Sequence, residues 1–206
     1  MNIEVFADIW CPFTHVGLRA IDDERRRLGR SDIGLIVRAW PLELVNGVPM
    51  PADKAVRNVA VLRGQVAPDM FADFDGEHFP TSTLPALALV ARAYRMDVQT
   101  GERASFAVRD ALFEHGQDIS DQTVLEALAG QLGLEPPDED DRRAVTADWE
   151  EGKRRGVRGS PHVYCGATDM FCPTLEISNT PETGLCVRRN TARLKALIAE
   201  CFARSA

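Results

Sequence analysis

The sequence predicts an α/β fold in which a block of helices interrupts a small sheet. Three observations lead to this prediction. Residues 2–39 read as strand, helix and strand, helical periodicity dominates residues 82–156, and strand-like segments return after residue 159. One α/β layer structure with a helical insert is the economical interpretation of this order.

The first forty residues have a β-α-β pattern. Residues 2–7 and 33–39 are short and rich in Ile and Val, which is typical of strands. Between them, apolar residues from Val16 to Leu28 recur at helical spacing, and Gly29 provides a stop. If the two strands are parallel neighbours, the connection between them is right-handed.

The middle of the chain reads as a series of helices. A short one is predicted from Asp53 to Arg63, inside a segment that is otherwise rich in loop signals. Four longer helices follow, and their expected limits are Ser82 or Thr83 to Arg95, Thr100 to Gly116, Ser120 to Gly133, and Asp138 to Gly156.

The last part of the chain reads as two strands and a helix. Residues 163–165 and 170–172 are expected to form a hairpin, with Cys165 facing Cys172, and residues 191–203 a final helix. Either cysteine offers a second reactive thiol, whereas a zinc site needs more ligands than this pair supplies.

We divide the chain into two units on this basis. Residues 1–45 and 149–206 form one α/β domain, and residues 46–148 form a helical insertion. The expected oligomeric state stays open, because no segment carries heptad repeats.

Composition disfavours several classes of function. The 206 residues are 45% apolar and 27% charged, as in globular proteins with a sizeable core. A net charge of −7 disfavours nucleic-acid and anionic-membrane partners. The sequence carries neither a secretory signal nor an apolar run long enough to span a membrane, so we expect a cytoplasmic protein. Five cysteines without such a signal favour free thiols over a disulfide framework, with Cys186 and Cys201 as packing or surface residues.

Cys11 is the strongest candidate for a catalytic residue. It stands where a helix is expected to begin, and the unpaired N–H groups and positive dipole end of a helix N-terminus favour a thiolate. Pro12 suits the first helical turn. Thr14 occupies the position where a redox pair would have its second cysteine, and its hydroxyl can either hold the thiolate or satisfy local backbone groups. A buried structural thiol is the alternative for Cys11. His15 is interpreted as an exposed residue of the first turn, with a role in proton transfer as the alternative.

The sequence resembles the DsbA family of thioredoxin-like oxidoreductases, and above all its FrnE-like branch. The segments that carry this resemblance are residues 8–12, 40–44 and 156–161, and it extends over nearly the whole chain. Kappa-class glutathione transferases and 2-hydroxychromene-2-carboxylate isomerases are relatives of the same family.

The resemblance implies a thioredoxin-like fold with an all-helical insertion between the second and third strands. It also implies that Ser160–Pro161 is a cis bond lying against Cys11. The catalytic residues would be Cys11, Thr14 and Pro161. Substrate contacts would come from a larger set, namely Trp10, Pro12, Phe13, Ser160 and His162.

Three functions are consistent with these residues. The first is a monothiol oxidoreductase that works through mixed disulfides at Cys11 and acts on small thiols or on protein thiols and disulfides. The second is a transferase or isomerase in which a thiol such as glutathione or mycothiol is the nucleophile, and the third is a redox-inactive binding module. In none of them is a metal or a tightly bound cofactor expected, and glutathione or mycothiol would serve as co-substrate.

Overall fold

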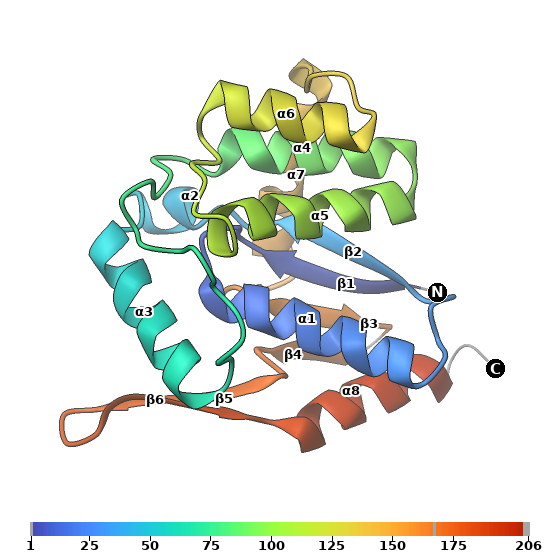
Figure 1. Ribbon diagram of the computed structural model, residues 1–206. Coiled ribbons are helices and arrows are strands. Elements are labelled where there is room, and N and C mark those ends of the chain that lie inside the picture. Colours follow the sequence, from blue (N-terminus) through green and yellow to red (C-terminus); the bar gives the residue numbers. More distant parts are fainter. Residues whose placement is uncertain (1, 167, 204–206) are drawn as a thin grey trace.

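A four-stranded sheet forms the centre of the computed structural model, which describes residues 2–166 and 168–203 (Figure 1). The strand order is β2-β1-β3-β4. The strands are β1 (Asn2–Ala7), β2 (Gly34–Ala39), β3 (His162–Cys165) and β4 (Thr168–Phe171). β1 and β2 are parallel, whereas β3 is antiparallel to both β1 and β4. The predicted strands and the predicted α/β, thioredoxin-like fold class are confirmed.

Helices account for most of the remaining chain. They are α1 (Pro12–Arg27), α2 (Leu42–Asn46), α3 (Ala52–Gln65), α4 (Leu84–Met96), α5 (Val98–Phe113), α6 (Gln122–Leu132), α7 (Glu139–Arg154) and α8 (Thr191–Ala203). Within the described ranges, each helix is too short or too polar to cross a membrane. α7 is continuous across the predicted division at residue 148, and the division itself stays a prediction.

The two faces of the sheet bury different side chains, because successive residues of a strand point to opposite sides. Ile3 and Val5 of β1 belong to an apolar cluster with α1 and α8. Phe6, on the other face, packs with Trp40 and Tyr164 beside α7. α1 therefore reaches the sheet with its N-terminus at the carboxyl end of β1, where Cys11 lies.

The helical insertion covers the free edge of β2. Side chains of α4, α5 and α7 accept the N–H groups that a neighbouring strand would otherwise bind. The pairs are Leu35 with Glu102 (3.1 Å), Val37 with Tyr94 (2.9 Å) and Ala39 with Asp148 (3.0 Å). An uncovered edge strand can pair with a strand of another chain. These bonds therefore fix the helical insertion against β2 and also prevent such pairing.

Two of the predicted helix starts need correction. α5 begins at Val98, not at Thr100, because Asp97 is its N-cap and accepts the Thr100 N–H at 2.8 Å. α6 begins after Asp121, which caps it in place of Ser120. In both places an aspartate caps as well as the predicted residue would, and it directly precedes the first turn that forms.

A second, two-stranded sheet was not predicted from the sequence. β5 (Leu175–Thr180) and β6 (Gly184–Arg189) form an antiparallel ribbon, which runs beneath α3 in Figure 1. Val187 on this ribbon is buried and its N–H donates to the side chain of Gln65 at 2.6 Å. Most of the ribbon is exposed, so its residues lack the apolar alternation that marks a strand. The short helix α2 was missed as well.

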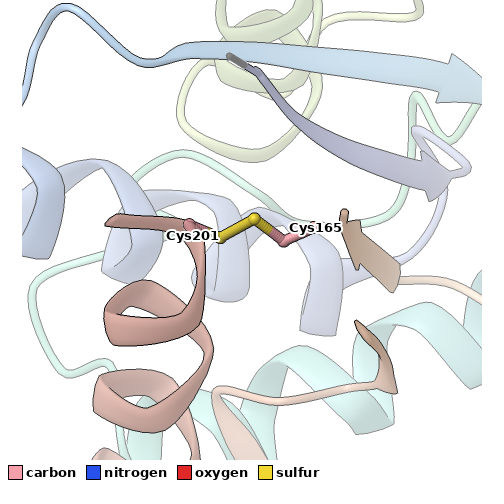
Figure 2. Close-up of a disulfide and its surroundings, with 2 residues drawn as sticks. All are labelled: Cys165 and Cys201. Carbon is pink, nitrogen blue, oxygen red and sulfur yellow. A yellow bond between two sulfur atoms is a disulfide. The ribbon is translucent and has the colours of Figure 1, made fainter. Parts of the chain in front are cut away.

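The predicted arrangement of the cysteines is wrong. Cys165 pairs with Thr168 in the hairpin, and Cys172 follows the end of β4. Cys165 instead forms a disulfide with Cys201 of α8 (Figure 2). Both half-cystines are buried, so Cys201 is neither a surface residue nor a free thiol. Cys11, Cys172 and Cys186 are the free cysteines of the described chain.

Gly152 allows α7 to lie directly on the sheet, and we expect a side chain there to be costly. A Cβ at this position would lie 2.5 Å from the Trp40 ring and 3.1 Å from the Phe6 ring. Gly152→Ala should lower the free energy of unfolding by about 1–3 kcal/mol, as overpacking does. Denaturation by urea measures this change.

Gly130→Ala is the matched control. Gly130 also lies within a helix, but an added Cβ would meet nothing within 4 Å. Alanine there should raise the free energy of unfolding by about 0.5–1 kcal/mol. Equal effects at the two glycines would contradict the close approach of α7 to the sheet.

Candidate functional site

Cys11 is the N-cap residue of α1, as the sequence predicts. Its carbonyl accepts the N–H groups of Thr14 (3.0 Å) and His15 (3.2 Å), so the thiol stands at the start of the first turn. Pro12 is the first residue of the helix. The side chain of Cys11 is 6% exposed, and its sulfur donates a hydrogen bond to the Ser160 carbonyl at 3.1 Å. The thiol is thus held against the loop that precedes β3.

The loop before β3 brings a proline to the same place. The Ser160–Pro161 peptide bond is cis, in agreement with what the resemblance implies. A Cβ on Gly17 of α1 would lie 3.7 Å from the Pro161 ring and 2.9 Å from the Thr174 hydroxyl. The distance to Pro161 is an ordinary contact, so it is the approach of α1 to Thr174 that requires a glycine at this position.

Thr14 and Ser160 join the helix to the loop by their hydroxyl groups. The two oxygens are 2.8 Å apart, and the Ser160 hydroxyl also accepts the Asp8 N–H at 2.9 Å. Both the hydroxyl and the N–H of Thr14 act to lower the pKa of the Cys11 thiol. Four of the predicted site residues, Cys11, Thr14, Ser160 and Pro161, therefore come together.

The expectation of a stabilised thiolate needs correction. Burial raises the pKa of the Cys11 thiol above its usual value. The hydrogen bonds from Thr14 and Ser160 act to lower this pKa, and the nearby charge of Asp8 raises it. Burial outweighs the helix N-terminus because an anion loses its hydration when it enters an apolar environment. At rest, Cys11 is a thiol and donates its proton toward Ser160.

Asp8 lies in the same loop as Cys11, between β1 and α1, and the sequence singled it out only as part of the segment 8–12. Its side chain is fully buried. The carboxylate accepts the N–H groups of Trp10 and Leu42. Burial raises the pKa of Asp8 to about 6 in spite of these bonds. Asp8 is therefore a buried titrating group at the base of the site.

Arg109 of α5 is a second charged residue that the sequence analysis missed. It is 1% exposed, and one of its nitrogens donates to both the carbonyl and the hydroxyl of Ser105 at 2.8 Å. Another nitrogen donates to the Asp8 carbonyl at 3.4 Å. Burial lowers the pKa of Arg109 to about 10, and the charges of Asp8 and Cys11 oppose this change. Its position on the apolar face of α5, with Ser105 and Leu112, was the signal available in the sequence.

His15 is buried, contrary to the expectation of an exposed residue. Its Nε2 lies 2.6 Å from Glu114, whose other oxygen accepts the Phe71 N–H at 2.8 Å. The ring packs between Phe71 and Phe113. Burial lowers the pKa of His15, so the ring is neutral near pH 7. His15 joins α1 to the end of α5 through Glu114, and the same carboxylate holds the segment after α3.

His162 and Trp10, two of the predicted substrate-contacting residues, do not face the Cys11 thiol. His162 points to the other face of the sheet, where its ring nitrogens meet the Arg158 N–H (3.1 Å) and Asp169 (2.8 Å). Strand alternation places it opposite Pro161, and it stacks beside Tyr164. Trp10 has no exposed surface and stacks on Phe79 inside the core.

Pro12 and Phe13 occupy the first turn of α1 with different exposure. Pro12 is buried, whereas Phe13 is half-buried against the main apolar cluster. Phe13 is thus the predicted contact residue that can present an apolar surface beside the thiol. In the described part of the chain, no three His, Cys, Asp or Glu side chains are grouped as metal ligands.

The fold and this site define a thioredoxin-like protein with a thiol at the start of its first helix. The DSBA-like thioredoxin domain family matches residues 2–179, and the chain belongs to this family. No curated protein sequence matches it.

Solved structures with the same fold include thiol-disulfide enzymes. A Nitrosomonas europaea protein described as a protein disulfide isomerase has 18% identity and a TM-score of 0.68, over 100% of this chain and 98% of its own. A Streptomyces coelicolor protein described as a DsbA oxidoreductase has 18% identity and a TM-score of 0.68, over 97% of this chain and 89% of its own. The cytosolic disulfide reductase DsbM from Pseudomonas aeruginosa, solved with GSH, has 16% identity and a TM-score of 0.62, over 100% of this chain and 98% of its own. At these identities the likeness concerns the fold.

Asp8 should make stability depend on pH in a defined direction. Its pKa is about 6 in the folded protein against a usual 3.8, so the folded state holds the proton more tightly than the unfolded state. The stabilisation is complete below about pH 4 and is lost as the pH rises through 6. At about 1.4 kcal/mol per pKa unit, this difference of about two units corresponds to about 3 kcal/mol.

Comparison with Asp8→Asn isolates this effect from the other carboxylates. The free energy of unfolding of the variant, relative to that of the wild type, should rise by about 3 kcal/mol between pH 4 and pH 7. A difference that stays constant with pH would show that Asp8 does not titrate as a buried carboxyl.

The Thr14 hydroxyl should accelerate the reaction of Cys11. Thr14→Val removes a donor that lowers the pKa of the thiol, so iodoacetamide should modify Cys11 more slowly at neutral pH. The expected decrease is about two- to tenfold, the equivalent of one hydrogen bond. Thr14→Ser keeps the hydroxyl and should react at nearly the wild-type rate. Equal rates for the valine and serine variants would contradict this role of Thr14.

Proposed function

We propose that this protein is a thiol–disulfide oxidoreductase that works through a mixed disulfide at Cys11, without a Cys-x-x-Cys pair. The observation that carries the proposal is the Cys11 sulfur, held 3.1 Å from the Ser160 carbonyl at the start of α1. Membership of the DSBA-like family supports this class of reaction. Glutathione or mycothiol would be the co-substrate, and DsbM, a structure of the same fold, was solved with GSH.

The reaction would proceed in two exchanges. The Cys11 thiolate attacks one sulfur of a disulfide, a mixed disulfide forms, and the other sulfur leaves as a thiolate that takes up a proton. A second small thiol then attacks the mixed disulfide and restores Cys11. The substrate disulfide is reduced, and the small thiol is oxidised.

The raised pKa of Cys11 favours the reducing direction. DsbA is a strong oxidant because its reduced form is stabilised, as a thiolate of low pKa is. Burial gives Cys11 the opposite shift, so the reduced protein lacks that stabilisation. We therefore infer a disulfide reductase that works in the cytoplasm, where small thiols are abundant.

The Ser160 carbonyl would take part in substrate binding. At rest it accepts the Cys11 thiol, and formation of the mixed disulfide removes this donor. The carbonyl is then free to accept a backbone N–H group of the substrate, while Pro161 and Phe13 offer apolar contacts beside it. Protein disulfides and mixed disulfides of small thiols are the substrate class that this arrangement fits.

Replacement of Cys11 tests the proposal. With a glutathionylated peptide as substrate and glutathione as reductant, Cys11→Ser should lower the rate of deglutathionylation to the uncatalysed background. Cys186→Ser, which changes another free cysteine, should retain the wild-type rate.

Two outcomes would overturn the proposal. Equal rates for wild type and Cys11→Ser would remove Cys11 as the nucleophile. If glutathione binding is saturable in Cys11→Ser and both proteins retain exchange activity, the bound thiol would itself be the nucleophile.

A further inference from the structure

Cys172 is a second buried thiol beside the candidate site. It follows β4 directly, and its N–H donates to the Pro161 carbonyl at 2.9 Å. The pairing of β3 with β4 continues in this way past His162 and Phe171, so Cys172 lies across from Pro161. Its side chain is 5% exposed, and it is free.

The two cysteines are held by neighbouring residues of the same loop. The Cys11 sulfur bonds to the Ser160 carbonyl, and the Cys172 backbone bonds to the Pro161 carbonyl. The Cys11 side chain and the Cys172 backbone are thus held at adjacent residues, Ser160 and Pro161. Burial is the main cause of the raised pKa of the Cys172 thiol, and an ionised Cys11 would add to this effect.

The surroundings of Cys172 include groups that favour its thiolate. The Leu175 N–H bonds to its sulfur, and the positive charge of Arg193 acts in the same direction. The Arg193 guanidinium is fixed nearby, since it donates to the Phe171 carbonyl at 3.3 Å. Backbone φ at Cys172 is 45°, a conformation uncommon for residues other than glycine.

We propose that Cys172 is the resolving thiol for Cys11 and takes the part that a second motif cysteine plays in a Cys-x-x-Cys site. The inference rests on the proposed function, because it begins from the mixed disulfide at Cys11. The Cys172 sulfur attacks the Cys11 sulfur, a Cys11–Cys172 disulfide forms, and the substrate leaves as a thiolate that takes up the proton lost by Cys172. Two molecules of glutathione or mycothiol then reduce the new disulfide.

Cys172 rests as a thiol, because burial raises its pKa to about 12. It therefore loses its proton in the resolving step, and the substrate thiolate that leaves takes this proton up.

Exposure to oxidised glutathione tests the inference. In the wild type, a non-reducing peptide map should contain a Cys11–Cys172 disulfide and little glutathione on Cys11. In Cys172→Ser the resolving sulfur is absent, so the occupancy of glutathione on Cys11 should be at least about tenfold higher. Cys186→Ser, the matched control, should behave as the wild type.

The outcomes separate the two proposals. Equal glutathione occupancy on Cys11 in the wild type and in Cys172→Ser, with no linked peptide, would overturn the role of Cys172 and leave Cys11 as a monothiol. Absence of both the adduct and the linked peptide, in the wild type and in Cys172→Ser alike, would overturn the reaction at Cys11 itself. Circular dichroism of the serine variant checks that it folds.

Discussion

The buried carboxylate of Asp8 holds together the elements that build the site. It receives N–H groups from Trp10 and from Leu42 at the start of α2. Its own backbone joins the Ser160 hydroxyl on one side and Arg109 on the other. An ionised carboxylate without partners would be costly in this interior, so the loop after β1 and the start of α2 must take their observed positions to satisfy it, while α5 and the loop before β3 are tied to the Asp8 backbone. The position of Cys11 follows from this constraint, since it lies three residues further along the same loop.

This constraint also sets the chemistry of the thiol. The packing that fixes Cys11 excludes water from it, and burial then outweighs the helix N-terminus and raises the pKa of the thiol. The charge of Asp8 acts in the same direction, whereas Thr14 acts against it. The hydrogen bond from Cys11 to the Ser160 carbonyl agrees with a raised pKa, because only a protonated sulfur can donate it. A thiol held in this state is suited to give electrons to a disulfide more than to take them.

Local signals made the fold and the central residue predictable. Pro12 at a helix start, the Ile- and Val-rich strands and the capping residue Asp138 act over a few residues, and each is present in the structure. The contacts that sequence could not predict join distant positions. Asp8 and Arg109 are 101 residues apart, and the burial of His15 depends on Glu114, which is 99 residues away. The spacing of apolar residues along the sequence contains no information about which distant residues will be in contact.

The cysteines illustrate the same limit. Cys165 and Cys172 are close in sequence, and a simple hairpin would have placed them face to face. The true register pairs Cys165 with Thr168, which directs Cys165 toward α8 and leaves Cys172 at the site. Register depends on the side chains that each face must bury, and those faces are defined only once α1 and α8 are in place.

The pH dependence of Cys11 alkylation in the wild-type protein tests the central claim most directly. Mass spectrometry of separate peptides distinguishes Cys11 from the other free cysteines. The account predicts a midpoint for Cys11 above the unperturbed cysteine value of about 8.5, because burial disfavours the thiolate. A midpoint well below that value would show that the helix N-terminus dominates after all. Cys11 would then be an activated thiolate at rest, and the inference of a reducing direction would fail.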